Sequence, residues 1–256
     1  MGVASDQSHD RTQNSELGPE AILGMLEAMH SDESPDPSEG LRARKKRKLR
    51  QQISDVATAM FLTYGFESVT VATIAAACEV SEQTVFNYFP TKESMLFDRS
   101  ESTTNAVADA VRVRTDVPLI DAVVHAVAAQ FQSRRPEGGD EAAQLHLLRL
   151  FAAVATGSPT LVASRLTEFA RSTQAVAVAL GERVDADPND PQVQMAALVV
   201  AGIVRVRQES TYRHSQQTPS TAALADTAHC DLLLAAQIAE PALAAFDKKR
   251  APDAID

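Results

Sequence analysis

The spacing of apolar residues predicts a helical protein. In the first clear segment they recur every three or four positions, which places them on one face of a helix: Ile53, Val56, Ala57, Met60, Phe61 and Tyr64. Gly65 follows directly and is a typical helix stop. We find no alternation of apolar and polar positions that favours a strand. The expected fold class is therefore all-α.

Two shorter helices follow at once. Thr70 is placed to cap a helix over 71–78, and Ser81 to cap another over 82–89. Only Glu79 and Val80 separate them, and Pro90 ends the second one. Three short helices with a tight turn between the last two indicate a helix-turn-helix unit, whose final helix suits the DNA major groove.

The rest of the chain also predicts helices, with prolines near most boundaries. Thr91 is the expected cap of the first of them, and Pro241 is expected to break or kink the last. The approximate spans are 92–114, 118–133, 140–156, 159–182, 190–213 and 219–246. By contrast, Ser, Asp, Glu, Pro and Gly dominate residues 1–40, so we expect an acidic disordered extension. One exception is the helical spacing over 19–30, which fits either a transient helix or a partner-docking helix.

Charge is distributed unevenly. The chain of 256 residues has a net charge of −10. Residues 1–40 carry a net −8, residues 41–92 a net +4 and residues 93–256 a net −6. A basic segment between acidic ones indicates a local binding site for a polyanion. Seven of the ten residues over 41–50 are basic, and we interpret them as a flexible arm that reaches DNA through Arg44, Lys45, Lys46, Arg47 and Lys48.

The residues of the helix-turn-helix segment resemble those of TetR-family transcriptional regulators. The stretches that carry the resemblance are Ala-Met-Phe-Leu-Thr-Tyr-Gly-Phe (59–66), Thr-Val-Ala-Thr-Ile-Ala (70–75) and Val-Ser-Glu-Gln-Thr-Val-Phe-Asn-Tyr-Phe-Pro-Thr-Lys-Glu-Ser-Met-Leu (80–96). They lie within residues 53–96, a span that makes up about a sixth of the chain. The resemblance implies three domains, with the extension over 1–40, the arm and DNA-binding domain over 41–98, and a helical-bundle domain for ligand binding and dimerisation over 99–256.

The resemblance also implies which residues meet DNA. Val80, Val85 and Phe89 should pack inward, which leaves the opposite face of their helix for DNA. Side-chain amides pair well with adenine, apolar groups meet thymine methyls, and hydroxyl or ammonium groups bind phosphates. The expected contacts on these grounds are Thr70, Gln83, Thr84, Phe86, Asn87, Tyr88 and Lys92.

The segment departs from the family at three positions. Glu79 stands where the family often has Gly, which costs about 1–2 kcal/mol if that backbone is left-handed. Near the position of Glu82 the family often has a basic residue, and at the position of Asn87 it often has Arg or His. The target sequence is therefore not predicted.

The C-terminal part contains no catalytic or metal-binding signature, so we expect no enzyme, no metal and no cofactor. By resemblance it should form a homodimer through its last two long helices and hold a pocket for a small, largely apolar effector. Candidate pocket residues are Leu145, His146, Leu148, Arg149, Phe151, Phe169, Met195, Val199 and Gln208.

The expected function is that of a repressor that binds a palindromic operator in double-stranded DNA as a homodimer and is released by its effector. Cys78 and Cys230 predict no disulfide framework, and no apolar run is long enough to span a membrane. We therefore expect a cytoplasmic protein, at the nucleoid when bound to DNA. The alternatives are a helical protein–protein adaptor with a basic partner-binding corner, and a helical enzyme whose active site gives no clear signature.

Overall fold

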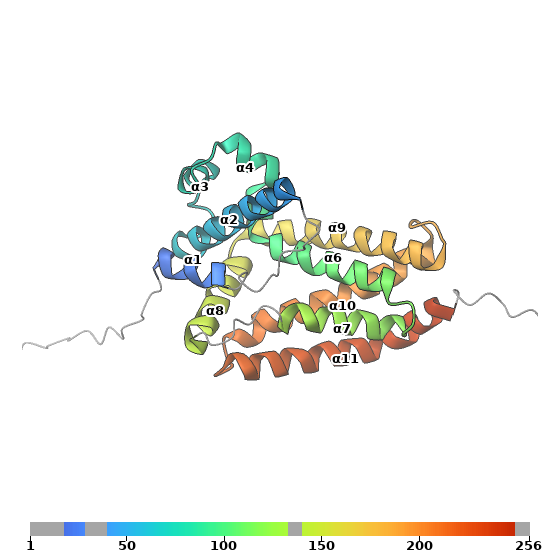
Figure 1. Ribbon diagram of the computed structural model, residues 1–256. Coiled ribbons are helices and arrows are strands. Elements are labelled where there is room, and N and C mark those ends of the chain that lie inside the picture. The colour runs from blue at the N-terminus through green and yellow to red at the C-terminus, as the bar shows by residue number, and fades with distance from the viewer. Residues whose placement is uncertain (1–17, 29–39, 133–139, 249–256) are drawn as a thin grey trace, which may run out of the picture.

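The computed structural model describes residues 18–28, 40–132 and 140–248. These residues form helices and no strand, so the all-α prediction is confirmed. The helices, shown in Figure 1, are α1 (Pro19–Ala28), α2 (Leu41–Tyr64), α3 (Val71–Ala77), α4 (Glu82–Tyr88), α5 (Lys92–Leu96), α6 (Asp98–Val113), α7 (Leu119–Gln132), α8 (Glu141–Gly157), α9 (Pro159–Val184), α10 (Pro191–Ser215) and α11 (Thr221–Asp247).

Short polar side chains begin the three small helices of the N-terminal unit, as predicted. The hydroxyls of Thr70, Ser81 and Thr91 each accept a hydrogen bond from the backbone N–H three residues later. Such a cap is worth about 1 kcal/mol, because it satisfies a donor that the helix itself leaves free. Gly65 ends α2 with a positive φ of 83°.

The N-terminal unit has its own core. Phe61 from α2, Ile74 from α3 and Phe89 after α4 are fully buried in it. Val85 and Phe89 pack inward, as predicted, and Val80 is partly buried beside them. Leu161 at the start of α9 is also part of this core, which joins the unit to the rest of the protein.

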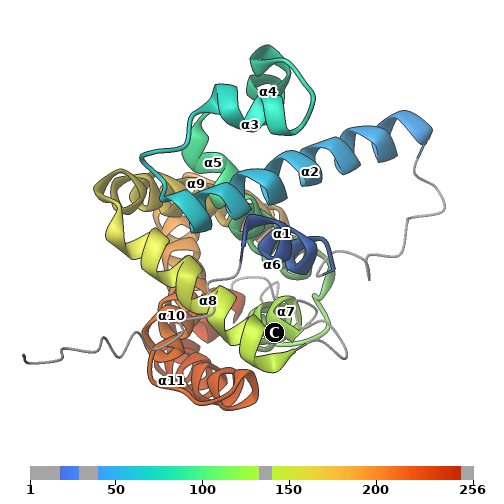
Figure 2. The same cartoon turned by 90° about the vertical axis from the view of Figure 1, so that its left-hand side faces the viewer.

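A second core lies between α6, α7, α9, α10 and α11, which form an elongated bundle. The three short helices α3, α4 and α5 sit with α2 over one end of this bundle (Figures 1 and 2). The last two helices, α10 and α11, pack along each other. The N-terminal unit, which consists of α2 to α5, and the bundle therefore meet near the beginnings of α6 and α9.

Two expectations about secondary structure are wrong. Residues 41–50 belong to helix α2 and are not a flexible arm. The helix expected over 92–114 is interrupted at Phe97, which ends α5 and precedes α6. Of the break or kink expected at Pro241, the break does not occur, because helix α11 continues through that residue.

Residues 19–28 form α1, so a helix is present where the spacing over 19–30 indicated one, and the assignment of 1–40 to a disordered extension is wrong there. Residues 1–17 and 29–39 of that predicted extension lie outside the described residues. Ile22 and Leu26 are 1% and 3% exposed, because they pack against Ala59 and Leu62 of α2 and against Leu147 of α8. Helix α1 thus connects α2 to α8.

Candidate DNA interface and effector pocket

Helix α4 presents polar and apolar groups to solvent. Gln83, Phe86 and Asn87 are exposed, while Val85 on the opposite face is buried. The Nε2 amide of Gln83 donates to Oδ1 of Asn87 at 3.2 Å, which holds the two side chains side by side. This face offers amide donors and acceptors, the groups that pair with adenine edges in the major groove.

The other predicted contacts on and near α4 have partial structural roles. The hydroxyl of Thr84 lies 2.8 Å from that of Ser81, at the start of the helix. Tyr88 is half-buried against the core of the unit. Thr70 is exposed, and its hydroxyl caps α3.

Lys92 is held inside the protein. Its ammonium donates to the carbonyls of Phe66 at 2.9 Å and Val69 at 3.0 Å, and it lies 4.1 Å from the centre of the Phe66 ring. These contacts secure α5 to the turn between α2 and α3. Lys92 is therefore engaged in a structural role for which its neighbours in the sequence provide no signal.

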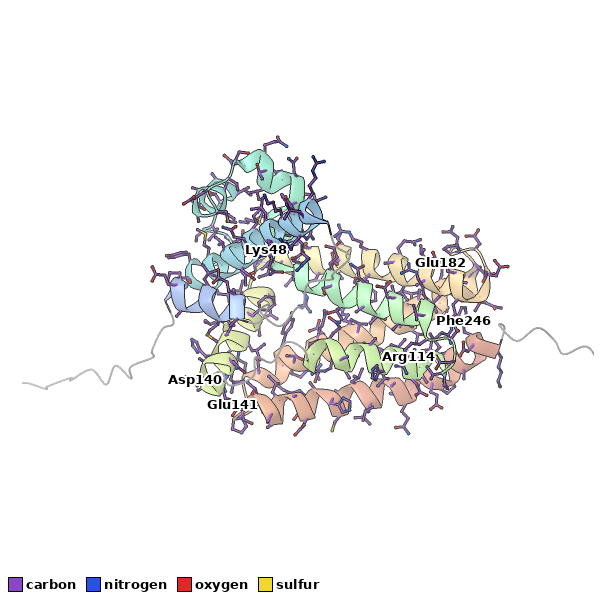
Figure 3. All side chains as sticks on the ribbon, in the orientation of Figure 1. Lys48, Arg114, Asp140, Glu141, Glu182 and Phe246 are labelled. Atoms are coloured by element: carbon purple, nitrogen blue, oxygen red, sulfur yellow. The ribbon has the colours of Figure 1, made fainter. Side chains whose placement is uncertain are left out.

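The basic run is a helical surface. Arg44, Lys45, Lys46, Arg47 and Lys48 are all exposed and lie in the N-terminal half of α2 (Figure 3). Figure 2 shows these turns projecting beyond the rest of the protein. Their positive charge is carried on a rigid element.

Arg50 connects three helices, a role that sequence reasoning missed. Its guanidinium donates to Asp98 at the start of α6, to Glu101 in α6 and to the carbonyl of Tyr88 at the end of α4. It also lies 4.5 Å from the centre of the Phe89 ring. Burial raises the pKa of the Asp98 carboxyl, and the nearby Arg50 acts in the opposite direction.

A second connection joins the DNA-binding unit to α9. The hydroxyl of Ser158, the cap of α9, donates to Oε1 of Glu67 at 2.7 Å. This hydrogen bond lowers the pKa of the Glu67 carboxyl. The turn after α2 is therefore fixed to the helix that forms one wall of the cavity described next.

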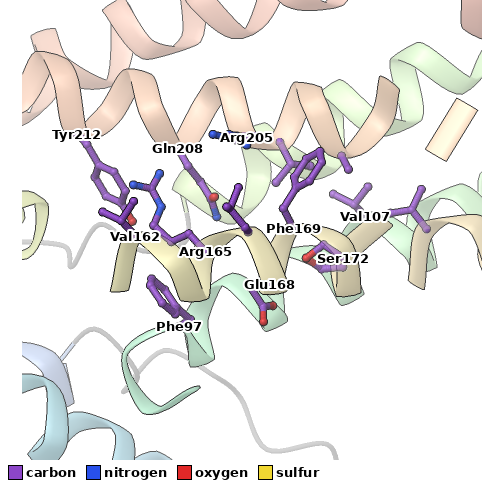
Figure 4. A pocket seen from close by; sticks show the side chains of 15 residues that line it. Phe97, Val107, Val162, Arg165, Glu168, Phe169, Ser172, Arg205, Gln208 and Tyr212 are labelled. Carbon is purple, nitrogen blue, oxygen red and sulfur yellow. The ribbon is translucent and has the colours of Figure 1, made fainter. Parts of the chain in front are cut away.

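A cavity of about 150 Å³ lies between α6, α9 and α10. Figure 4 shows Phe97, Phe169 and Tyr212 around it, with Gln208 from α10. Val107, Val176 and Val204 add apolar surface. Thr104 and Ser172, whose hydroxyls lie 2.9 Å apart, add a polar pair. Phe97 also belongs to the core of the DNA-binding unit, so the cavity reaches the junction of the two parts.

Charged groups surround the cavity. Arg165 and Arg205 line it, and both form ion pairs with Glu209. Glu168 also lines it and pairs with Arg171 at 2.8 Å. Burial raises the pKa of the Glu168 carboxyl, although the charge of Arg171 lowers it in part.

Two of the nine candidate pocket residues, Phe169 and Gln208, line this cavity. Arg149 instead donates to the carbonyls of Ser215 and Thr218 after α10. Phe151 packs against Tyr212, with ring centres 5.9 Å apart. Met195 is exposed, and the remaining candidates lie on α8 or α10 outside the lining: Leu145, His146, Leu148 and Val199.

The outer faces of α10 and α11 are apolar. Met195, Leu198 and Val206 are exposed on α10, and Leu233, Leu234 and Ile238 are exposed on α11. Ile238 is 83% exposed, which is unusual for so large an apolar side chain. Adjacent apolar side chains on neighbouring helices are typical of an association surface.

No His, Cys, Asp or Glu cluster suited to a metal ion occurs among residues 18–28, 40–132 and 140–248. Over the same residues, no single helix is long and apolar enough to cross a membrane. The pair α8 and α9 passes that test only when joined across a bend of 90°.

An exposed recognition helix, braced by two others and followed by a helical domain with a cavity, defines a DNA-binding regulator of the helix-turn-helix class. Residues 53–98 match the family described as bacterial regulatory proteins, tetR family, and residues 117–234 match the MftR C-terminal domain. The HTH-type transcriptional regulator TcmR of Streptomyces glaucescens is 31% identical over 176 residues, which span 66% of this chain and 76% of that protein. The chain belongs to the TetR family and is a DNA-binding transcriptional regulator with a C-terminal ligand-binding domain.

Two solved structures of regulators described as TetR-family match this chain with TM-scores below 0.5. A putative TetR-family regulator from Mesorhizobium loti MAFF303099 has a TM-score of 0.41 and 19% identity, covering 78% of this chain and 98% of its own. A regulator from Streptomyces coelicolor has a TM-score of 0.37 and 19% identity, covering 80% and 88%. Members of the TetR family are transcription factors rather than enzymes.

Proposed function

We propose that this protein is a repressor that binds a palindromic operator as a homodimer and leaves it when a small, largely apolar effector fills the cavity. The observation that carries the proposal is the exposed face of α4. Gln83, Phe86 and Asn87 lie on it, and Val85 on the opposite face is buried in the core. Water hydrates the two amides well, whereas the exposed ring of Phe86 leaves apolar surface that a partner can cover.

On this proposal α4 enters the major groove. The paired amides of Gln83 and Asn87 each contact an adenine, at about 1–3 kcal/mol of discrimination per good pair. Phe86 meets a thymine methyl. Thr70, Thr84 and Tyr88 contact phosphates, which fix the register.

The basic surface from Arg44 to Lys48 supplies attraction that does not depend on sequence. Because it is helical, its charges approach the DNA backbone as a fixed array beside the recognition helix. Lys92 supports this surface indirectly, because its hydrogen bonds to the carbonyls of Phe66 and Val69 hold α5 against the turn that precedes α3.

Dimerisation uses the apolar faces of α10 and α11. Burying Met195, Leu234 and Ile238 against a second copy removes them from water at about 25 cal/mol per Å² of apolar surface. The two-fold symmetry of the dimer then places its two recognition helices so that they bind two half-sites whose centres lie about 34–36 Å apart.

Effector release acts through Phe97. This residue lines the cavity, packs in the core of the DNA-binding unit and interrupts the helix between α5 and α6. A ligand in the cavity displaces its ring, and α5 moves with it. The ligand shifts the equilibrium between DNA-binding and released states only by its difference in affinity for the two. The protein acts on the nucleoid in the cytoplasm.

The test is selection of binding sites from random duplex DNA with the wild type and with the Gln83→Ala/Asn87→Ala double variant. The matched control is Asn189→Ala/Gln192→Ala, which removes the same two amide types from exposed positions just before α10 and in its first turn. We expect a palindromic consensus with the wild type and the control, and its loss with the α4 variant.

If the wild type enriches no sequence and its weak DNA binding disappears at modest salt, the proposal fails. The basic helix would then be a general polyanion site, as in an adaptor protein. If a consensus survives the double substitution, α4 is not the reading element.

A further inference from the structure

We propose that the cavity takes an aromatic monoanion, with one ring among the apolar walls and an acidic group at Arg165 and Arg205. The inference rests on the proposed function in one respect, that this cavity is the effector site. It goes further by naming the chemical class of the ligand. Charge balance, cavity size and the aromatic lining carry it independently.

The side chains that line the cavity carry a net positive charge. They include two arginines, Arg165 and Arg205, and one acid, Glu168. Outside the lining, Glu209 pairs with both arginines, Arg171 pairs with Glu168 at 2.8 Å, and the charge of Glu101 also acts on Glu168. An anionic ligand restores neutrality, whereas a cation would increase the imbalance.

Arg205 is the more accessible of the two arginines. Its Nε lies 3.7 Å from Glu209, and its side chain is 49% exposed. A guanidinium carries five N–H donors, so this single long contact leaves Arg205 able to bind a second acid. Arginine and a carboxylate form two parallel hydrogen bonds, which fixes the orientation of a ligand as well as attracting it.

The volume limits what the cavity encloses. A cavity of about 150 Å³ accepts a molecule of the size of benzene, and drug-sized ligands occupy about 300–1,000 Å³. One aromatic ring therefore fits inside. Any larger body extends through the opening, where Val162 and Leu166 are exposed and provide apolar surface.

The lining favours a flat ring over an aliphatic chain. Phe97, Phe169 and Tyr212 present rings to the cavity, and aromatic pairs add about 0.5–1.5 kcal/mol beyond the area they bury. A cationic ligand would seek the faces of these rings. Two faces are already taken, because Arg205 lies 5.5 Å from the centre of Phe169 and Arg165 lies 5.6 Å from that of Tyr212.

The test compares three probes that share one ring system and differ in charge: 2-naphthoate, 2-naphthamide and 2-naphthylmethylamine. Their binding to the full-length protein, without DNA, is measured by isothermal titration calorimetry near neutral pH. We expect the dissociation constant of the acid to be lower than that of the amide by about tenfold or more, since a hydrogen bond between charged groups is the stronger kind. The amine should bind most weakly.

Variants locate the acid-binding groups. In Arg205→Gln and Arg165→Gln the preference for acid over amide should fall to about twofold or less, while the affinity for the amide stays near that of the wild type. The control is Arg213→Gln, which removes an exposed arginine that lies on α10, like Arg205, but outside the lining of the cavity. Ser172→Leu and Ala201→Leu each fill part of the cavity and should weaken binding of the acid and the amide.

An amide or amine that binds as tightly as the acid would overturn the inference, as would no binding of any probe. The same holds if the acid preference survives both arginine substitutions, or if neither filling variant weakens binding. Operator affinity is measured separately with 2-naphthoate added. If the acid binds as expected but leaves operator affinity unchanged, the ligand class stands and the effector role of the cavity is what fails.

Discussion

The Arg50 guanidinium donates two hydrogen bonds to one carboxylate oxygen of Asp98, from Nε at 2.9 Å and from Nη2 at 2.6 Å. Its remaining terminal nitrogen, Nη1, donates to the carbonyl of Tyr88 at 2.9 Å. One side chain of α2 therefore fixes the end of the recognition helix to the beginning of α6, a helix that lines the cavity. The relative position of cavity and recognition helix depends on this contact.

Replacing Arg50 by Met should destabilise the protein by about 1.5–3 kcal/mol, because the largely buried Asp98 loses its charged partner. Urea unfolding at fixed protein concentration measures the change. Arg112→Met is the control, since Arg112 pairs with the exposed carboxylates of Asp109 and Glu182. A surface pair of that kind contributes about 0–1 kcal/mol. Equal losses in the two variants would contradict the structural role assigned to Arg50.

Glu79 has a φ of 57°, in the left-handed region that glycine adopts at no steric cost. Glu79→Gly should therefore stabilise the protein by about 1 kcal/mol, measured by urea unfolding. Glu79→Gln, which removes the charge but keeps the side chain, should leave stability nearly unchanged. A stabilisation by Gln equal to that by Gly would assign the effect to charge instead of backbone strain.

Helix α1 should contribute to stability as a packed element. Ile22→Ala and Leu26→Ala should each cost about 2–5 kcal/mol, because both side chains are buried between α2 and α8. Glu20→Ala, at an exposed position of the same helix, is the control. Thermal and urea unfolding measure the losses. If the two apolar substitutions cost no more than the control, α1 does not pack in solution as it does here.

The helix-turn-helix unit was largely predictable because its signals are local. The caps Thr70, Ser81 and Thr91, the stop at Gly65 and the inward face at Val85 follow from residues a few positions apart. The helical state of 41–50 also had a local signal, since Lys, Arg, Leu and Gln are good helix formers and neither Gly nor Pro interrupts the run. Its high charge favoured the wrong interpretation as a flexible arm.

The roles of Arg50, Lys92 and Phe97 depend on tertiary structure. A long basic side chain gives the same sequence signal whether it reaches solvent, a phosphate or a carbonyl 26 positions away, as Lys92 does with Phe66. Pocket residues were equally hard to place. Phe169 and Gln208 line the cavity whereas Arg149 and Phe151 do not, because lining depends on how α8, α9 and α10 cross and not on which residue types they carry.

The stability of the protein should depend on pH through Glu168. Burial raises the pKa of its carboxyl from the ordinary value of 4.5, so the folded state binds the proton more tightly than the unfolded state does. The stability that this proton provides is present below the ordinary pKa and is lost as pH rises through the folded-state pKa. Glu168→Gln should therefore be more stable than the wild type at neutral pH, and the difference should shrink as pH falls towards 4.5. Urea unfolding of both proteins across this range gives the difference. If the ion pair with Arg171 outweighed the cost of burial, Glu168→Gln would instead be less stable than the wild type at neutral pH, and this deficit would shrink on acidification.

Phe97 offers a direct optical test of communication between the cavity and the DNA-binding unit. The chain contains no tryptophan, so Phe97→Trp introduces a single indole at the interruption between α5 and α6. Its side chain would touch the cavity and the core around Phe89 together, since Phe97 belongs to both. If operator binding and cavity occupancy are coupled, each must alter the environment of this position, because coupling between two sites is reciprocal.

We expect the emission maximum of the Phe97→Trp variant to shift when a selected operator duplex is added, and to shift in the opposite direction when a cavity ligand releases the duplex. Phe246→Trp is the control, because Phe246 is similarly buried but lies near the end of α11, in the core of the bundle. Its emission should not change with DNA. Anisotropy of a labelled duplex confirms that both variants bind. A variant that binds the operator with no change at position 97 would exclude this residue as the link. The contacts of Glu67 with Ser158 and Thr160 at the start of α9 would then be the next candidate.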